Sequence, residues 1–216
     1  MTVGDVYEKY RLLPILKMHQ LRVAAVGKTI CDHFDRGLDT QSVVLACLLH
    51  DMGNIIKSDL SVFPAALEPQ GRDHWEQVKK EFIATYGPDE HQAALTIARE
   101  IGASEAVIRL MDGIGFSKLE ITRDHPLFEP KIVEYSDCRV SPAGITDMTV
   151  RLEDARARYA YQPTDIPRTP ERFNELLGAA HEIEMQIFAH TDITPTELSE
   201  EALAPSIAAL REYKIA

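Results

Sequence analysis

The stretch LACLLHDMGN, residues 45–54, indicates both the fold and the chemistry of this sequence. It is the end of an apolar run typical of a buried helix, and the run closes on the doublet His50–Asp51. An isolated ionised carboxylate costs several kcal/mol in a low-dielectric interior, so such groups are normally neutralised, paired or bound to a metal. The imidazole beside this carboxylate favours the metal.

Apolar residues recur at helical spacing before the doublet, without sustained period-two alternation. A stripe over residues 12–30 predicts a long first helix that carries His19 and ends near Gly37. A second helix is predicted to begin at Asp39 or Thr40 and to end at the doublet. The two helices would therefore bring a second histidine toward the first.

Helical patterns continue through the rest of the chain. Pro130 suits the first position of a helix that carries Asp137 and stops before Pro142. Residues 58–71, rich in proline and glycine, predict a connection that could lie over a cleft. Further helices are predicted over residues 73–85, 88–101, after Ser104, and over 146–160, 170–189 (N-cap Thr169, then Pro170) and 196–213.

These patterns predict an all-α fold in which the helices form a bundle. We expect residues 1–145 to form a metal-binding helical core and residues 146–216 to form C-terminal helices that pack on it within one structural domain. Residues 162–169 are proline-rich and are expected to be a short linker. The acidic residues of the last helix are expected to face solvent; they are Glu197, Glu200 and Glu201.

Composition restricts the partners and the compartment. The chain of 216 residues is 45% hydrophobic, and no apolar run approaches the roughly 18 residues of a membrane span. No signal peptide is evident, so we expect a cytoplasmic protein that does not associate with a membrane. A net charge of −11 argues against duplex nucleic acid as a partner. A small anion is still compatible, since a metal centre reverses the local potential. Assembly into a homo-oligomer is left open.

Four side chains lie on apolar stripes where a bundle could bring them together: His19, His50, Asp51 and Asp137. Mixed imidazole and carboxylate ligands suit Fe, Mn, Zn, Co or Ni better than calcium. Neighbouring residues point about 100° apart on a helix, so the doublet can reach one centre only near a helix end. The sequence therefore predicts a divalent transition metal.

A buried ion-pair network is the alternative reading of these four residues. Arg22 or Arg139 would then supply the positive charge in place of the metal. The three cysteines form no Cys-x-x-Cys pair, which argues against a thiolate zinc site and against a disulfide framework.

The motifs MHQLRVA around His19, LACLLHDMGN around the doublet and IVEYSDCRV around Asp137 resemble the H...HD...D pattern of the HD-domain superfamily of metal-dependent phosphohydrolases. The resemblance covers about residues 12–141. It implies an all-α fold and a divalent metal at the four matching positions. It also implies hydrolysis of phosphate esters or anhydrides.

His91, in YGPDEHQAALTIAREIG, resembles the additional histidine of superfamily members that bind two metals. In those members the pattern continues to another histidine, but this sequence has Leu110-Met111-Asp112-Gly113 there. A second metal position is therefore unresolved, and Asp112 or His125 would have to complete it.

The function expected from this resemblance is hydrolysis of a nucleotide or another small phosphorylated compound by a metal-activated water. Asp51 is the candidate catalytic residue that ligates metal and orients the water. Arg22 and Lys57 are candidates for binding phosphate. The alternatives are an HD-fold di-iron oxygenase, made less favourable by Asp112, and a degenerate HD module with a binding or regulatory role.

Overall fold

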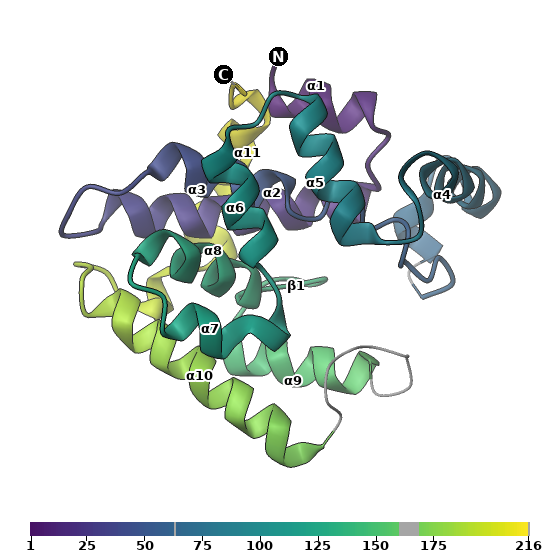
Figure 1. Cartoon of the computed structure of the whole chain (residues 1–216). Helices are drawn as coiled ribbons and strands as arrows, with labels where there is room; N and C mark the ends of the chain where they lie inside the picture. The colour runs from purple at the N-terminus through teal and green to yellow at the C-terminus, as the bar shows by residue number, and fades with distance from the viewer. Residues whose placement is uncertain (63, 160–168, 216) are drawn as a thin grey trace.

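The computed structural model describes residues 1–62, 64–159 and 169–215, and it confirms the predicted all-α fold (Figure 1). The named strands form one antiparallel pair, β1 (Val140–Ser141) with β2 (Gly144–Ile145). The α-helices, in chain order, are α1 (Val3–Lys9), α2 (Pro14–Asp32), α3 (Thr40–Leu49), α4 (Arg72–Tyr86), α5 (Glu90–Glu100), α6 (Glu105–Gly113), α7 (Leu119–Arg123), α8 (Phe128–Cys138), α9 (Met148–Tyr159), α10 (Pro170–Phe188) and α11 (Glu200–Ala209). The 3₁₀ helices are η1 (Pro64–Leu67), η2 (Phe116–Lys118), η3 (Pro195–Glu197) and η4 (Leu210–Glu212).

Helices α2, α3 and α8 form the centre of the molecule. Every residue of α3 from Ser42 to Leu49 is buried, as its nearly continuous apolar sequence requires. Gly27 permits the close approach of the three helices, because a Cβ there would lie 3.2 Å from both Cys47 Sγ and Ser136 Oγ. The residues that follow His19 on α2 are therefore held tightly against α3 and α8.

The chain turns sharply after α3, and the His50–Asp51 doublet lies at that turn. His50 is the C-cap of α3, and the chain continues through successive turns to Lys57. Gly53 packs directly on the start of α5, where a Cβ would overlap the carbonyl oxygen of Glu90. This contact fixes the position at which the chain leaves the helix, and with it the direction of the doublet.

The C-terminal helices pack on this centre: α10 lies along α7 and α8, and α11 lies against α2 (Figure 1). Tyr135 Oη donates a hydrogen bond to Glu184 on α10 at 2.7 Å. The Arg139 guanidinium donates to the carbonyl oxygens of Pro195 and Leu198. The two chain ends lie side by side, joined by a bridge between Thr2 and Lys214. None of the described helices is long and apolar enough to span a membrane.

Several predicted helix starts are confirmed. Asp39, Ser104 and Thr169 cap the helices that follow them, each accepting a hydrogen bond from a backbone N–H of the first turn. Pro130 lies in the first turn of α8, but the helix begins two residues earlier, at Phe128. Proline is tolerated there because the first N–H groups of a helix have no partner within the helix.

The predicted long helix over residues 12–30 is confirmed as α2, Pro14–Asp32, which carries His19. Its predicted end near Gly37 is wrong, because the helix ends at Asp32, and the short helix α1 before it was not predicted. The chain then leaves the helical path because the Asp35 backbone N–H donates to the His190 carbonyl oxygen and Phe34 pairs with Thr191. The predicted linker falls outside the described residues, except for Thr169.

Candidate metal centre

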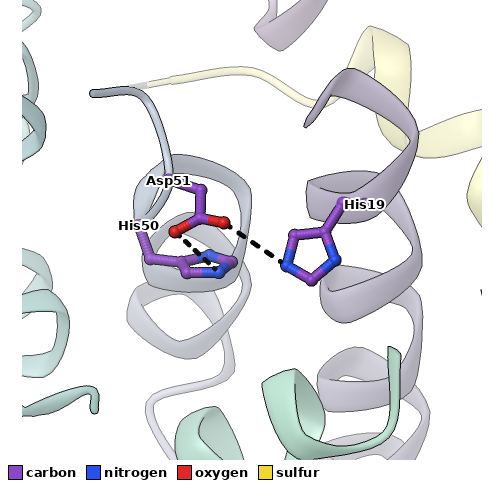
Figure 2. Close-up of side chains that lie close together, drawn as sticks. All are labelled: His19, His50 and Asp51. Atoms are coloured by element: carbon purple, nitrogen blue, oxygen red, sulfur yellow. Dashed lines mark ion pairs between the residues drawn. The ribbon is translucent and has the colours of Figure 1, made fainter. Parts of the chain in front are cut away.

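Three of the predicted ligands converge where α2 passes the end of α3 (Figure 2). His19 comes from α2, and the two residues of the doublet follow α3. Asp51 lies between the imidazoles, with Oδ2 3.5 Å from His19 Nε2 and Oδ1 3.6 Å from His50 Nε2. One ligand atom from each residue lies within 4.8 Å of the other two, so this group could hold a metal ion.

Asp137 reaches the same group from α8. Its Oδ1 atom lies 3.0 Å from His19 Nε2 and 3.5 Å from His50 Nε2. The structure therefore brings together the four side chains that the sequence predicts as ligands, from α2, from the end of α3 and from the distant α8.

The hydrogen bonding of His50 leaves one ring nitrogen facing the cluster. Its Nδ1 atom lies 2.9 Å from the carbonyl oxygen of Cys47 and, as a donor there, directs the Nε2 lone pair toward Asp137. Within the described residues, His50 Nε2 and Asp137 Oδ1 are buried without a hydrogen-bond partner. Two facing acceptor atoms in a buried site require a proton or a cation between them. The site therefore fits a metal.

The pKa values of the buried residues indicate how strongly these groups interact. Burial alone lowers the pKa of His50, but the carboxylates of Asp51 and Asp137 outweigh burial and raise that pKa to about 9. Burial alone raises the pKa of Asp137, but the imidazoles of His19 and His50 lower it well below its ordinary value. Without a metal, a proton on His50 Nε2 therefore faces the ionised Asp137, and a divalent cation would take the place of that proton.

The ion-pair alternative expected Arg22 or Arg139 to neutralise these carboxylates. Arg22 is instead paired with Glu200 on α11, through Nε at 2.8 Å and Nη2 at 2.7 Å from Oε1. Arg139 donates to backbone carbonyls and to Tyr135. Glu200, which was expected to face solvent, keeps 45% of its side chain exposed but also reaches across to α2.

The other proposed phosphate-binding residue is also engaged in an ion pair. Lys57 Nζ lies 3.2 Å from Glu90 Oε1 at the start of α5. Both Arg22 and Lys57 thus have carboxylate partners, and a phosphate would have to compete with these partners.

His91 does not belong to the group of ligand atoms described above. Its Nε2 atom lies 3.0 Å from Asp112 Oδ1, on α6, so the two residues proposed for a second metal position are neighbours. His125, the other proposed substitute, accepts a hydrogen bond from the nearby Leu127 N–H in its own turn. Of the two substitutes proposed for the second metal position, Asp112 is therefore the one that lies beside His91.

Two residues that support the site were missed in the sequence. Gln20 is fully buried, and its Oε1 accepts the backbone N–H of Asp51 at 3.2 Å. Its signal was present, since Gln20 is a polar residue between Leu16 and Val23 on an apolar face. Glu134 precedes Asp137 by one helical turn on α8, and burial raises its pKa to about 7.

Arg151 on α9 is the third missed residue. Its Nη2 atom lies 3.8 Å from Asp137 Oδ2, and its Nε donates to the carbonyl oxygen of Val140 at 3.3 Å. The sequence carried no signal for this contact, because residues 146–160 were interpreted as scaffold.

Residues 17–112 match the HD domain family model, which confirms the predicted relation of this segment to the HD-domain superfamily. This match suggests metal-dependent hydrolase-type activity, and the group formed by His19, His50 and Asp51 could hold the metal. The matched segment includes His19 and the doublet, whereas Asp137 lies beyond it. Comparisons with curated proteins and with solved structures gave no match.

Proposed function

We propose that this chain is a metal-dependent phosphohydrolase that acts on a nucleotide or another small phosphorylated compound. The observation that supports this proposal most directly is the buried pair His50 Nε2 and Asp137 Oδ1, which lie 3.5 Å apart and have no hydrogen-bond partner in the part of the chain that the structure describes. With His19 and Asp51 they form a donor set of imidazoles and carboxylates, which suits Fe, Mn, Co, Ni or Zn.

His19, His50, Asp51 and Asp137 would hold a divalent metal, which would supply an acidified water and positive charge for a phosphoryl oxygen. The protein orients the ligands: the Cys47 carbonyl holds the His50 ring, and Gln20 holds the backbone of Asp51. Asp51 is partly exposed, at 19% of its side chain, so water can reach its carboxylate. We assign Asp51 as a ligand that also accepts the proton of the attacking water.

The test is phosphate release from a panel of nucleotides and other phosphorylated compounds with added Mn²⁺, Co²⁺ or Ni²⁺. We expect turnover that the Asp51→Asn variant loses by a hundredfold or more, since loss of one charge-stabilising group typically costs about 10²–10³ in rate. Asp35→Asn is the matched control, because Asp35 pairs with a histidine on the surface. It should keep full activity.

Three results would contradict the proposal. If the metal-loaded protein hydrolyses no phosphorylated compound, the assigned reaction is wrong. An oxygen-dependent reaction with two irons per chain would favour an oxygenase. Protein that binds no divalent metal would favour a degenerate module with a binding role.

A further inference from the structure

The α6–α7 connection, residues 112–118, passes beside α8 (Figure 1). At its start, Asp112 Oδ1 lies 3.0 Å from His91 Nε2, at the beginning of α5. The residue before His91 is Glu90, whose carbonyl oxygen packs against Gly53, two residues after the doublet. The connection therefore begins next to the turn that carries two of the candidate metal ligands.

A buried glutamate fixes the middle of this connection to α8. Glu134 is 1% exposed, and its Oε2 accepts the backbone N–H of Gly115 at 2.7 Å. Glu134 precedes Asp137 by one helical turn, so both side chains lie on the same side of α8. Burial raises the pKa of Glu134 to about 7, and the charges of Asp137 and His50 also act on it. The Gly115 contact therefore ties the connection to the edge of the metal centre.

The side chain of Lys118 spans these two points of attachment. Its aliphatic part packs over Gly115, where a Cβ would lie 3.9 Å from Lys118 Cδ, and its ammonium donates to the carbonyl oxygen of Asp112. The Lys118 backbone N–H donates to the Gly115 carbonyl oxygen at 2.7 Å. An ammonium has three N–H donors, so two of them are available to an anion. These contacts hold Lys118 at the edge of the metal centre.

Lys118 differs from the two predicted phosphate-binding residues in its partner. Arg22 pairs with Glu200, and Lys57 pairs with Glu90. Among the described residues, no carboxylate lies within ion-pair distance of the Lys118 ammonium, and a backbone carbonyl carries no net charge to neutralise it. A phosphate at Lys118 would therefore gain a charge-assisted hydrogen bond without displacing an ion pair.

We propose that Lys118 binds an anionic group that adjoins the scissile phosphate of the substrate, such as the second phosphate of a nucleoside diphosphate. This inference rests on the proposed function. The ammonium lies outside ion-pair distance of Asp51 and Asp137, so an anion that it binds lies next to the phosphate at the metal centre. Glu134 is a positioning residue that holds the connection through Gly115. The substrate class is therefore a compound with two neighbouring anionic groups.

The reaction of a nucleoside diphosphate at this site is hydrolysis of its phosphoanhydride. The oxygen of water bonds to the terminal phosphorus as the bond from that phosphorus to the bridging oxygen breaks. The bridging oxygen leaves with the nucleoside monophosphate, and solvent receives the proton of the water. Negative charge grows on the leaving phosphate as the bond breaks, so Lys118 stabilises the transition state as well as the bound substrate.

The experiment measures kcat/KM for a nucleoside diphosphate and for the matching monophosphate with added Mn²⁺. Lys118→Met should lower the ratio of diphosphate to monophosphate kcat/KM by about 10- to 100-fold, as expected for a lost hydrogen bond to a charged group. Lys118→Arg should restore most of this ratio. Lys28→Met is the matched control, because Lys28 pairs with Asp32 near the far end of α2. It should keep the wild-type ratio.

Two variants of Glu134 test how Lys118 is positioned. Glu134→Gln keeps an oxygen that accepts the Gly115 N–H, so it should retain most of the wild-type ratio. Glu134→Leu removes that acceptor and should lower the ratio, although Lys118 itself is unchanged. A folded Glu134→Leu variant with the wild-type ratio would contradict the positioning role.

The outcomes separate this inference from the proposed function. A wild-type protein without phosphohydrolase activity contradicts the proposed function, and this inference with it. An active wild type that hydrolyses monophosphates alone, or equal ratios in Lys118→Met and Lys28→Met, contradicts this inference alone. A lower Tm of Lys118→Met with an unchanged ratio would show that Lys118 only caps the end of α6. If Glu134→Leu does not fold, the Lys118 variants decide the proposal by themselves.

Discussion

Two clusters of this molecule have the same composition, two histidines and two aspartates, but very different surroundings. The buried cluster is the candidate metal centre, formed by His19, His50, Asp51 and Asp137. The surface cluster lies where the end of α2 meets the end of α10 and is formed by His33, Asp35, His190 and Asp192. Side chains are 4–20% exposed in the buried cluster and 31–79% exposed in the surface cluster.

The contacts differ as much as the exposure. In the surface cluster each histidine has its own carboxylate: His33 Nδ1 lies 2.8 Å from Asp192, and His190 Nδ1 lies 2.8 Å from Asp35. In the buried cluster the ligand atoms converge, and His50 Nε2 faces Asp137 without a hydrogen-bond partner among the described residues. Convergence and desolvation, rather than residue type, therefore distinguish a candidate metal site from two ordinary ion pairs.

Metal affinity should show the largest difference between the clusters. His50→Gln should weaken Mn²⁺ binding by a hundredfold or more, because loss of a residue that only supports a ligand already costs about 10- to 100-fold. His190→Gln, in the surface cluster, should bind as the wild type does. Competition with a chelator measures both, and an equal loss in the two variants would remove the distinction between the clusters.

Thermal stability should follow the same division. Free metal at 100 times its Kd stabilises the folded state by about 2.7 kcal/mol, which raises Tm by roughly 5–11 °C for a chain of this size. The wild type and Asp192→Asn should show this rise on metal addition, whereas Asp137→Asn should lose most of it. Scanning calorimetry measures these Tm values. A full rise of Tm in Asp137→Asn on metal addition would show that the metal binds elsewhere.

Gln20 gives a smaller effect that concerns the buried cluster alone. Gln20→Leu leaves the N–H of Asp51 without its acceptor, which should cost about 1–3 kcal/mol of stability. Metal affinity should fall about tenfold, since the ligand loses its orientation. Gln41→Leu, at an exposed position on α3, is the control. Unchanged affinity in Gln20→Leu would show that Asp51 is oriented without this contact.

The surface cluster should respond weakly, and mainly to acid and salt. A hydrogen bond from Arg36, followed by one from His190, lowers the pKa of Asp35 below its ordinary value of 3.8. Its stabilising effect is therefore present above pH 3.8 and is lost as the pH falls through the lower, folded-state pKa. Asp35→Asn should shift the urea midpoint slightly at pH 7 and less at pH 3, and high salt should reduce the shift. A large shift that salt does not change would show coupling to the core.

Much of the fold and part of the site could be predicted from one sequence. Helical periodicity identified the all-α class, and Asp39, Ser104 and Thr169 marked helix starts because their side chains bond to backbone groups only a few residues away. The end of the first helix could not be predicted in the same way, since it depends on Phe34 and Asp35 meeting residues of the distant α10 end.

The sequence by itself determined which side chains lie on buried faces, and so it could identify His19, His50, Asp51 and Asp137 as neighbours in a core. Only the tertiary structure decided which charge meets which: Glu200 reaches Arg22, Glu90 reaches Lys57, and Arg151 reaches Asp137. The physical reason is the separation along the chain of the residues that interact. Periodicity and caps depend on neighbours within a turn or two of helix, whereas an ion pair between helices depends on packing angles that no local pattern contains.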